Sequence, residues 1–180
     1  MGKDYVDLPI REICATQQPI RWVTVEKTLL DPICDQLGAG SDDRERGGLL
    51  GLSADNHFIV NFFLDKAAEA TACSYKPSEA VLRYFDHCPS SEICFGGIIH
   101  THKQMKELSR GDFEYIKAFF EANPKLKRMI SGVFTIADRK MHLYSFERAL
   151  FLVWYQTDLP AYLRRISDAC QLAKLEFQQT

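Results

Sequence analysis

The chain has 180 residues, of which 46% are apolar, and its formal net charge is −2. A chain of this size and composition fits a single globular domain, residues 1–180, with a core of its own. The near-neutral charge, without a dominant cluster of Lys or Arg, argues against a nucleic-acid partner. No apolar run approaches the length that crosses a bilayer, so we expect no membrane partner.

The first half of the chain alternates short apolar segments with turn residues. We expect a polar N-terminal arm over residues 1–19, then a strand over 20–25 and a helix that ends at Gly38. Further strands are predicted at 48–52 and 57–64, and a helix is predicted after Pro77.

The second half opens with an apolar run over residues 93–99 that ends in His100-Thr101-His102. A helix is predicted over 112–122, where Asn123-Pro124 ends it, followed by a hairpin of strands 129–137 and 140–146. The apolar segment 149–155 is strand-sized and predicts an interior strand, with a hydrophobic edge offered to a partner as the alternative.

The chain closes with a predicted helix over residues 158–178. Its apolar residues repeat at spacings of three and four: Leu163, Ile166, Cys170, Ala173 and Phe177. We expect this stripe to pack on its own domain, and pairing with a second copy in a homodimer is the alternative. Strands flanked by helices on both sides predict an α/β fold, a three-layer α/β/α sandwich around a mixed β-sheet.

The cysteines are scattered along the chain without Cys-x-x-Cys spacing, and no basic-then-apolar signal segment opens it. They are Cys14, Cys34, Cys73, Cys88, Cys94 and Cys170. This pattern predicts reduced, mostly buried thiols and a cytoplasmic protein.

His100 and His102 form a candidate metal site. Residues two apart on a strand point to the same face, roughly 6.6–6.8 Å apart along the backbone, so both imidazoles can approach one ion. A catalytic zinc typically has three protein ligands and an open position, and Asp112 is the nearest carboxylate placed to be the third. The alternative is that the His pair ends a buried strand while Ser109 and Asp112 form a helix capping box.

Glu45 stands immediately before a glycine-rich apolar segment, Gly47-Gly48-Leu49-Leu50-Gly51. With His100-x-His102 and Ser109-x-x-Asp112 following in that order, residues 20–150 resemble the JAMM metalloprotease family, also called JAB or MPN-plus domains, in a bacterial-type form. Two departures from the family pattern are Lys103 in place of Pro and a spacing to Ser109 that is one residue shorter. Without this resemblance, Glu45 would be read as part of a solvated charge run that begins at Asp42.

The resemblance implies the cytidine-deaminase-like JAB/MPN fold and one zinc per chain, held by His100, His102 and Asp112. Glu45 would be the general base, and Ser109 would donate its hydroxyl to the oxygen of the tetrahedral intermediate. It further implies a zinc-dependent isopeptidase or peptidase that cleaves after the C-terminal glycine of a ubiquitin-like protein. The alternatives are a catalytically silent scaffold of the same fold and a zinc amidohydrolase acting on a sulfur-carrier protein or a small amide.

Overall fold

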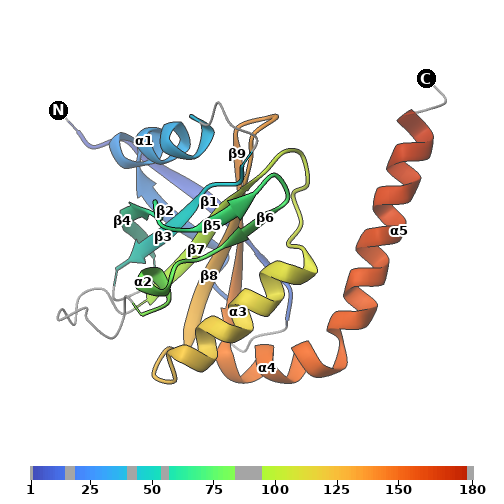
Figure 1. Cartoon of the computed structure of the whole chain (residues 1–180). Coiled ribbons are helices and arrows are strands. Elements are labelled where there is room, and N and C mark those ends of the chain that lie inside the picture. Colours follow the sequence, from blue (N-terminus) through green and yellow to red (C-terminus); the bar gives the residue numbers. More distant parts are fainter. Residues whose placement is uncertain (1, 15–18, 40–43, 54–56, 84–94, 178–180) are drawn as a thin grey trace.

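The computed structural model describes residues 2–14, 19–39, 44–53, 57–83 and 95–177 (Figure 1). Within these residues, seven strands close into a barrel in the order β1-β2-β4-β3-β7-β8-β9. They are β1 (Tyr5–Glu12), β2 (Trp22–Glu26), β3 (Gly47–Leu52), β4 (Phe58–Leu64), β7 (Phe95–His102), β8 (Arg128–Thr135) and β9 (Lys140–Glu147). The prediction of a three-layer α/β/α sandwich around a mixed β-sheet is therefore wrong, because the sheet closes on itself.

The barrel closes because of β1, which lies within the segment expected to be a polar arm. It pairs with β2 in antiparallel fashion, with Val6 opposite Val25, and with β9 in parallel, with Ile10 opposite Leu143. A strand that is paired on both sides removes the two edges that an open sheet would have. The alternation of Val6, Leu8 and Ile10 with polar residues or proline is the sequence signal for this strand.

A second, two-stranded sheet lies outside the barrel, made of β5 (Glu69–Thr71) and β6 (Ser74–Lys76). The helices are α1 (Lys27–Gly38), α2 (Glu79–Leu82), α3 (Arg110–Ala122), α4 (Arg148–Thr157) and α5 (Leu159–Phe177). Successive strand residues face opposite sides, so Leu50 packs in a cluster with α1, whereas Leu49 packs in a cluster with α3 and α4.

The apolar segment predicted as a strand over 149–155 forms α4 instead. Phe151 is fully buried, with its ring centroid 5.2 Å from that of Phe146 and 5.7 Å from that of Phe120, whereas Val153 is 62% exposed. A continuous apolar run has no hydrophobic periodicity that distinguishes a strand from a buried helix, and this segment forms a helix. The prediction of an interior strand is wrong.

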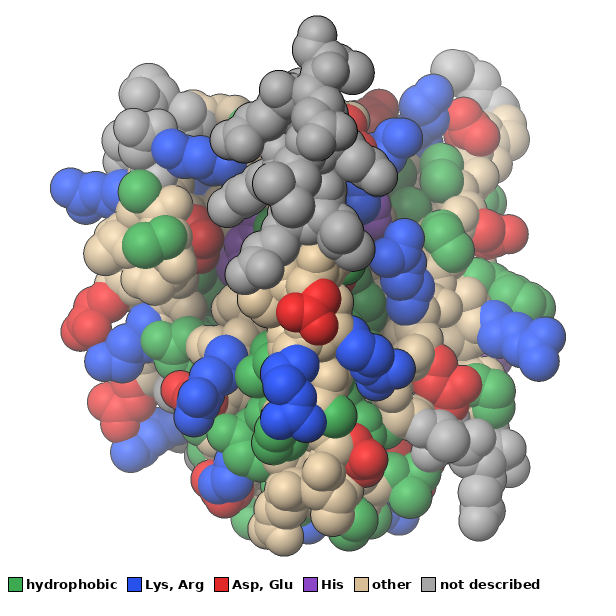
Figure 2. Space-filling model, turned by 90° about the vertical axis from the view of Figure 1, so that its right-hand side faces the viewer, with side chains coloured by type: hydrophobic (Ala, Val, Ile, Leu, Met, Phe, Trp, Pro, Cys, Tyr) green, Lys and Arg blue, Asp and Glu red, His purple; other side chains and the backbone are tan. Residues whose placement is uncertain are grey.

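Among the side chains of α5 that the structure describes, those of its first turns pack on the domain. Leu159 is buried, and Tyr162 and Leu163 are half-buried against the aromatic residues of α3 and α4. Beyond these turns the ribbon stands apart from the barrel (Figure 1). Figure 2 shows charged side chains of both signs over the face that α5 crosses. The side chains of Cys170, Ala173 and Phe177, which complete the predicted stripe, lie outside the described part of the chain.

Three of the cysteines can be placed, and all three carry free thiols: Cys14 is buried, Cys34 partly buried and Cys73 exposed. Cys88 and Cys94 lie outside the described residues. Among the helices that the structure describes, none combines the length and the apolar character needed to span a membrane.

Candidate metal centre

The end of β7 brings the two histidines together. The Nε2 atoms of His100 and His102 lie 2.9 Å apart, and the side chains are almost completely buried, with residue exposures of 2% and 6%. β7 is held between β3 and β8, with His100 opposite Gly47 on one side and Val133 on the other. The strand geometry therefore places both imidazoles on one face, as the sequence predicted.

Asp112 reaches the same point from the first turn of α3. Its Oδ1 lies 3.0 Å from Nε2 of His100, and its Oδ2 lies 3.6 Å from Nε2 of His102. Two ligand atoms on a tetrahedral zinc, each about 2.0–2.1 Å from the metal, are roughly 3.3 Å apart. The two Nε2 atoms, and His100 Nε2 and Asp112 Oδ1, are slightly closer together than this, at 2.9 and 3.0 Å. Two imidazoles and a carboxylate at this spacing are a donor set that fits a zinc ion.

The capping box that was the alternative explanation is also present. The backbone N–H of Ser109 donates to Asp112 Oδ2 over 2.6 Å, and the backbone N–H of Asp112 donates to Ser109 Oγ over 3.3 Å. The cap fixes the carboxylate while Oδ1 remains directed at His100. The cap and the metal site are therefore compatible, since ligating carboxylates are commonly held by such outer hydrogen bonds.

His102 is oriented by the loop that follows β7. Its Nδ1 lies 3.1 Å from the carbonyl oxygen of Met105, which can only accept a hydrogen bond. Nδ1 must then carry the proton in the neutral ring, which leaves the Nε2 lone pair for a metal. The loop with the shorter spacing between His102 and Ser109 thus orients a predicted ligand.

Glu45 lies beside the two imidazoles, just before β3. Its backbone N–H donates to the carbonyl of Thr71 over 2.7 Å, and the neighbouring carbonyl of Arg46 accepts from Thr101 over 2.7 Å. Ligand atoms of Glu45, His100 and His102 all lie within 4.8 Å of one another. Because Glu45 is half-buried here, it is not part of a solvated run; Asp42 and Asp43 lie outside the described residues.

Burial and mutual charge shift the acidities of this cluster. Burial, reinforced by the charge of Asp112 and opposed by that of His100, raises the pKa of Glu45 to about 7. Burial by itself would lower the pKa of His100, but the charge and hydrogen bond of Asp112 have a larger effect and raise the pKa of His100. Burial and the charge of His100 lower the pKa of His102. Burial also disfavours a charged Asp112, yet its two histidine neighbours leave its pKa lowered.

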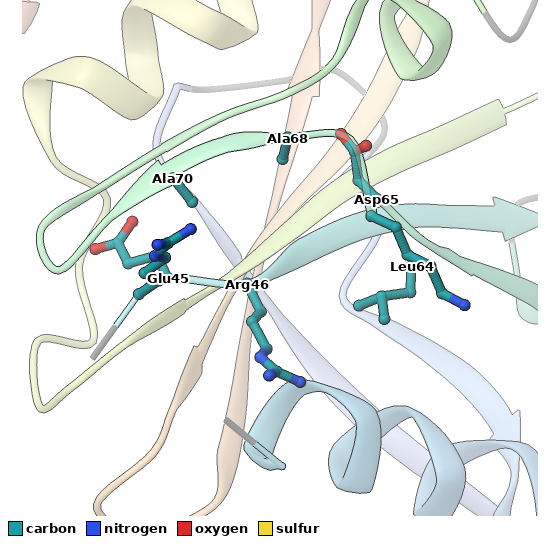
Figure 3. Close-up of a pocket in the computed structure, with 8 residues that line it drawn as sticks. Glu45, Arg46, Leu64, Asp65, Ala68 and Ala70 are labelled. Carbon is teal, nitrogen blue, oxygen red and sulfur yellow. The ribbon is translucent and has the colours of Figure 1, made fainter. Parts of the chain in front are cut away.

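The site opens into a cavity of about 480 Å³. Its lining residues come from β6, the loop after β7 and the start of α3, and they include Glu45, Tyr75, His102, Ser109, Asp112 and Tyr115. A second hollow of about 270 Å³ lies on the other side of Glu45, between β4 and β5 (Figure 3). The Arg46 side chain runs from this segment toward α1, where it donates to the carbonyl of Gln36.

The geometry thus gathers all five residues that the sequence singled out: Glu45, His100, His102, Ser109 and Asp112. It also adds three contributors that no motif indicated, namely the carbonyls of Thr71 and Met105 and the ring of Tyr75. Their roles arise from backbone contacts or long-range packing, which leave no spacing pattern in the sequence.

No family model matches the chain, and no curated protein matches it.

Proposed function

We propose that this protein is a zinc-dependent isopeptidase or peptidase of the JAMM type, which hydrolyses the amide bond after the C-terminal glycine of a ubiquitin-like protein. The observation that carries the proposal is the convergence of two imidazoles, a capped carboxylate and a half-buried glutamate beside one cavity. When bound, zinc supplies a Lewis acid that polarises a carbonyl group and acidifies water.

His100, His102 and Asp112 would hold the zinc ion, and Glu45 would move the proton. A carboxyl whose pKa lies at about 7 can both accept and release a proton near neutral pH. Zinc would add positive charge beside Glu45 and so favour its ionised, proton-accepting form. Glu45 would then take the proton from the attacking water and deliver it to the departing amine.

Ser109 would stabilise the oxygen that gains negative charge. Its Oγ already accepts the backbone N–H of Asp112, so the hydroxyl hydrogen is directed elsewhere, and Ser109 lines the same cavity as Glu45. A preorganised donor of this kind contributes about 10²–10³-fold to kcat in other acyl-transfer enzymes.

A Gly-Gly tail suits the surroundings of Glu45. The hollow beside it is lined in part by Ala68 and Ala70, whose small side chains leave room for an extended backbone without side chains of its own. Recognition would then depend on main-chain hydrogen bonds near the scissile bond and on the globular part of the partner.

The free thiols of Cys14, Cys34 and Cys73 support a cytoplasmic location.

The test combines metal analysis with cleavage of a ubiquitin-like protein fused through its C-terminal glycine to a reporter amine. We expect one zinc per chain in the wild type and in Glu45→Gln, because this substitution leaves the three ligands in place. Cleavage should fall by about 10²–10⁴-fold in Glu45→Gln. Glu121→Gln, which changes an exposed glutamate at the far end of α3, is the matched control and should cleave normally.

The other outcomes distinguish the alternatives. A wild-type chain that takes up no zinc in excess metal would indicate a scaffold. Full zinc content with turnover of small amides or of a sulfur-carrier protein, but not of ubiquitin-like fusions, would retain the chemistry and change the substrate. Unchanged cleavage by Glu45→Gln would reject the assignment of the base.

A further inference from the structure

Tyr75 lies against the metal centre, although it belongs to the hairpin outside the barrel. Its ring is stacked on that of His100, with 5.7 Å between centroids and 6° between planes, and the residue is only 2% exposed. Gly47, the register partner of His100 on β3, borders the same ring. A Cβ at Gly47 would lie 2.5 Å from Tyr75 Cζ, so the ring occupies the space that any other residue would fill.

The hydroxyl group of Tyr75 is also held in place, by a hydrogen bond to Asp65. The hydroxyl donates to Asp65 Oδ2 over 3.1 Å, and the same oxygen accepts the backbone N–H of Ser78 over 2.8 Å. The backbone N–H of Asp65 in turn donates to the carbonyl of Gly47 over 2.9 Å. Burial raises the pKa of Tyr75, so the hydroxyl keeps the proton that it donates.

The same hairpin also holds Glu45, through the hydrogen bond from its backbone N–H to the carbonyl of Thr71 in β5. One two-stranded unit therefore contacts a predicted ligand through β6 and the predicted base through β5. Thr71 pairs with Ser74, the residue before Tyr75, so the two contacts lie next to each other in the hairpin.

We propose that Tyr75 is a positioning residue that fixes the ring plane of His100, so that its Nε2 points to the place where His102 and Asp112 converge. The β5–β6 hairpin thereby sets the predicted ligand and the predicted base relative to each other. This inference rests on the proposed zinc site. It assigns no contact with substrate to Tyr75.

The test compares Tyr75→Phe, which keeps the ring, with Tyr75→Leu, which removes it. Zinc affinity is measured by competition with a chelator, and the site geometry is read from the visible absorption of the Co²⁺-loaded protein. Tyr75→Leu should weaken zinc binding by about 10–100-fold and alter the Co²⁺ spectrum, whereas Tyr75→Phe should stay within a few-fold of the wild type. Phe134→Leu, a fully buried ring in the cluster on the α1 side of the sheet, is the control for loss of packing alone.

A Tyr75→Leu protein with wild-type affinity and an unchanged Co²⁺ spectrum would overturn the inference. The same holds if Phe134→Leu weakens zinc binding equally, because the effect would then be general packing. If Tyr75→Leu does not fold, Tyr75→Phe decides the role of the ring. A loss of zinc affinity of 10-fold or more in Tyr75→Phe, which keeps the ring, overturns that role. Zinc affinity close to that of the wild type supports it.

Failure of the proposed function gives a different result. If the wild type binds no zinc, the inference is tested by the imidazole NMR signals of His100 in the metal-free protein. These signals should shift in Tyr75→Leu and not in Phe134→Leu. Unchanged signals in Tyr75→Leu would overturn the inference. If the wild type binds zinc but cleaves nothing, the proposed activity fails while the affinity series still decides the role of Tyr75.

Discussion

The first turn of α3 contributes to two buried regions of opposite character. Asp112 faces the imidazoles of His100 and His102, and the polar side-chain atoms of these three residues lie between 2.9 and 3.6 Å apart. Its neighbour Phe113 faces an aromatic layer, with ring centroids 6.3 Å from Phe146 and 5.4 Å from Trp154. The geometry of the polar cluster depends on how well each donor and acceptor is paired. The stabilisation from the aromatic layer depends on the apolar area that it buries. We therefore expect mutations to separate zinc binding from stability.

The largest effect should come from the aromatic layer. Phe151→Ala removes a fully buried ring that contacts Phe120, Phe146, Trp154 and Tyr155, and should lower the free energy of unfolding by about 4 kcal/mol. Chemical denaturation measures this change, with Val153→Ala on the exposed side of α4 as the control. Zinc affinity should remain within twofold of the wild type. A large loss of affinity would show that the two regions are coupled.

In the candidate metal centre, Asp112→Ala should weaken zinc binding by at least about 100-fold, equivalent to roughly 2.7 kcal/mol. The reason is that losing a predicted ligand should cost more than losing a residue that only orients a ligand. Asp112→Asn is the matched control, since its amide oxygen can still accept from the backbone N–H of Ser109 and keep the cap. Comparing the two variants separates the cap from the negative charge. Full zinc content in Asp112→Ala would indicate another third ligand, and Glu45 is the nearest candidate.

A smaller effect is expected from Glu45 in the metal-free protein. Its pKa is raised from 4.5 to about 7 in the folded chain, so the folded state holds this proton more tightly than the unfolded state does. Stability should therefore fall as pH rises from about 4.5 to 7, and the full cost remains above pH 7. Glu45→Gln should then stabilise the metal-free protein by about 1–2 kcal/mol at pH 8, after allowance for solvent screening, and by little at pH 4. Equal stabilisation at both pH values would mean that the carboxyl is not buried as described.

The sequence predicted the strand that carries the histidines, the helix that follows it and its capping box, because these depend on local periodicity and on residues within a few positions of one another. The period-two geometry of β7 places His100 and His102 on one face, and the spacing from Ser109 to Asp112 specifies the cap. Both features arise within short segments, where the local backbone conformation fixes the geometry.

The tertiary structure decided the closure of the barrel, the helical state of α4 and the surroundings of the candidate metal centre. Closure depends on Ile10 meeting Leu143, more than 130 positions away, and α4 is helical because Phe151 docks on rings from α3 and β9. Tyr75 and Thr71 reach the site only through the placement of a hairpin outside the barrel. Such contacts depend on long-range packing, which single-sequence periodicity does not encode.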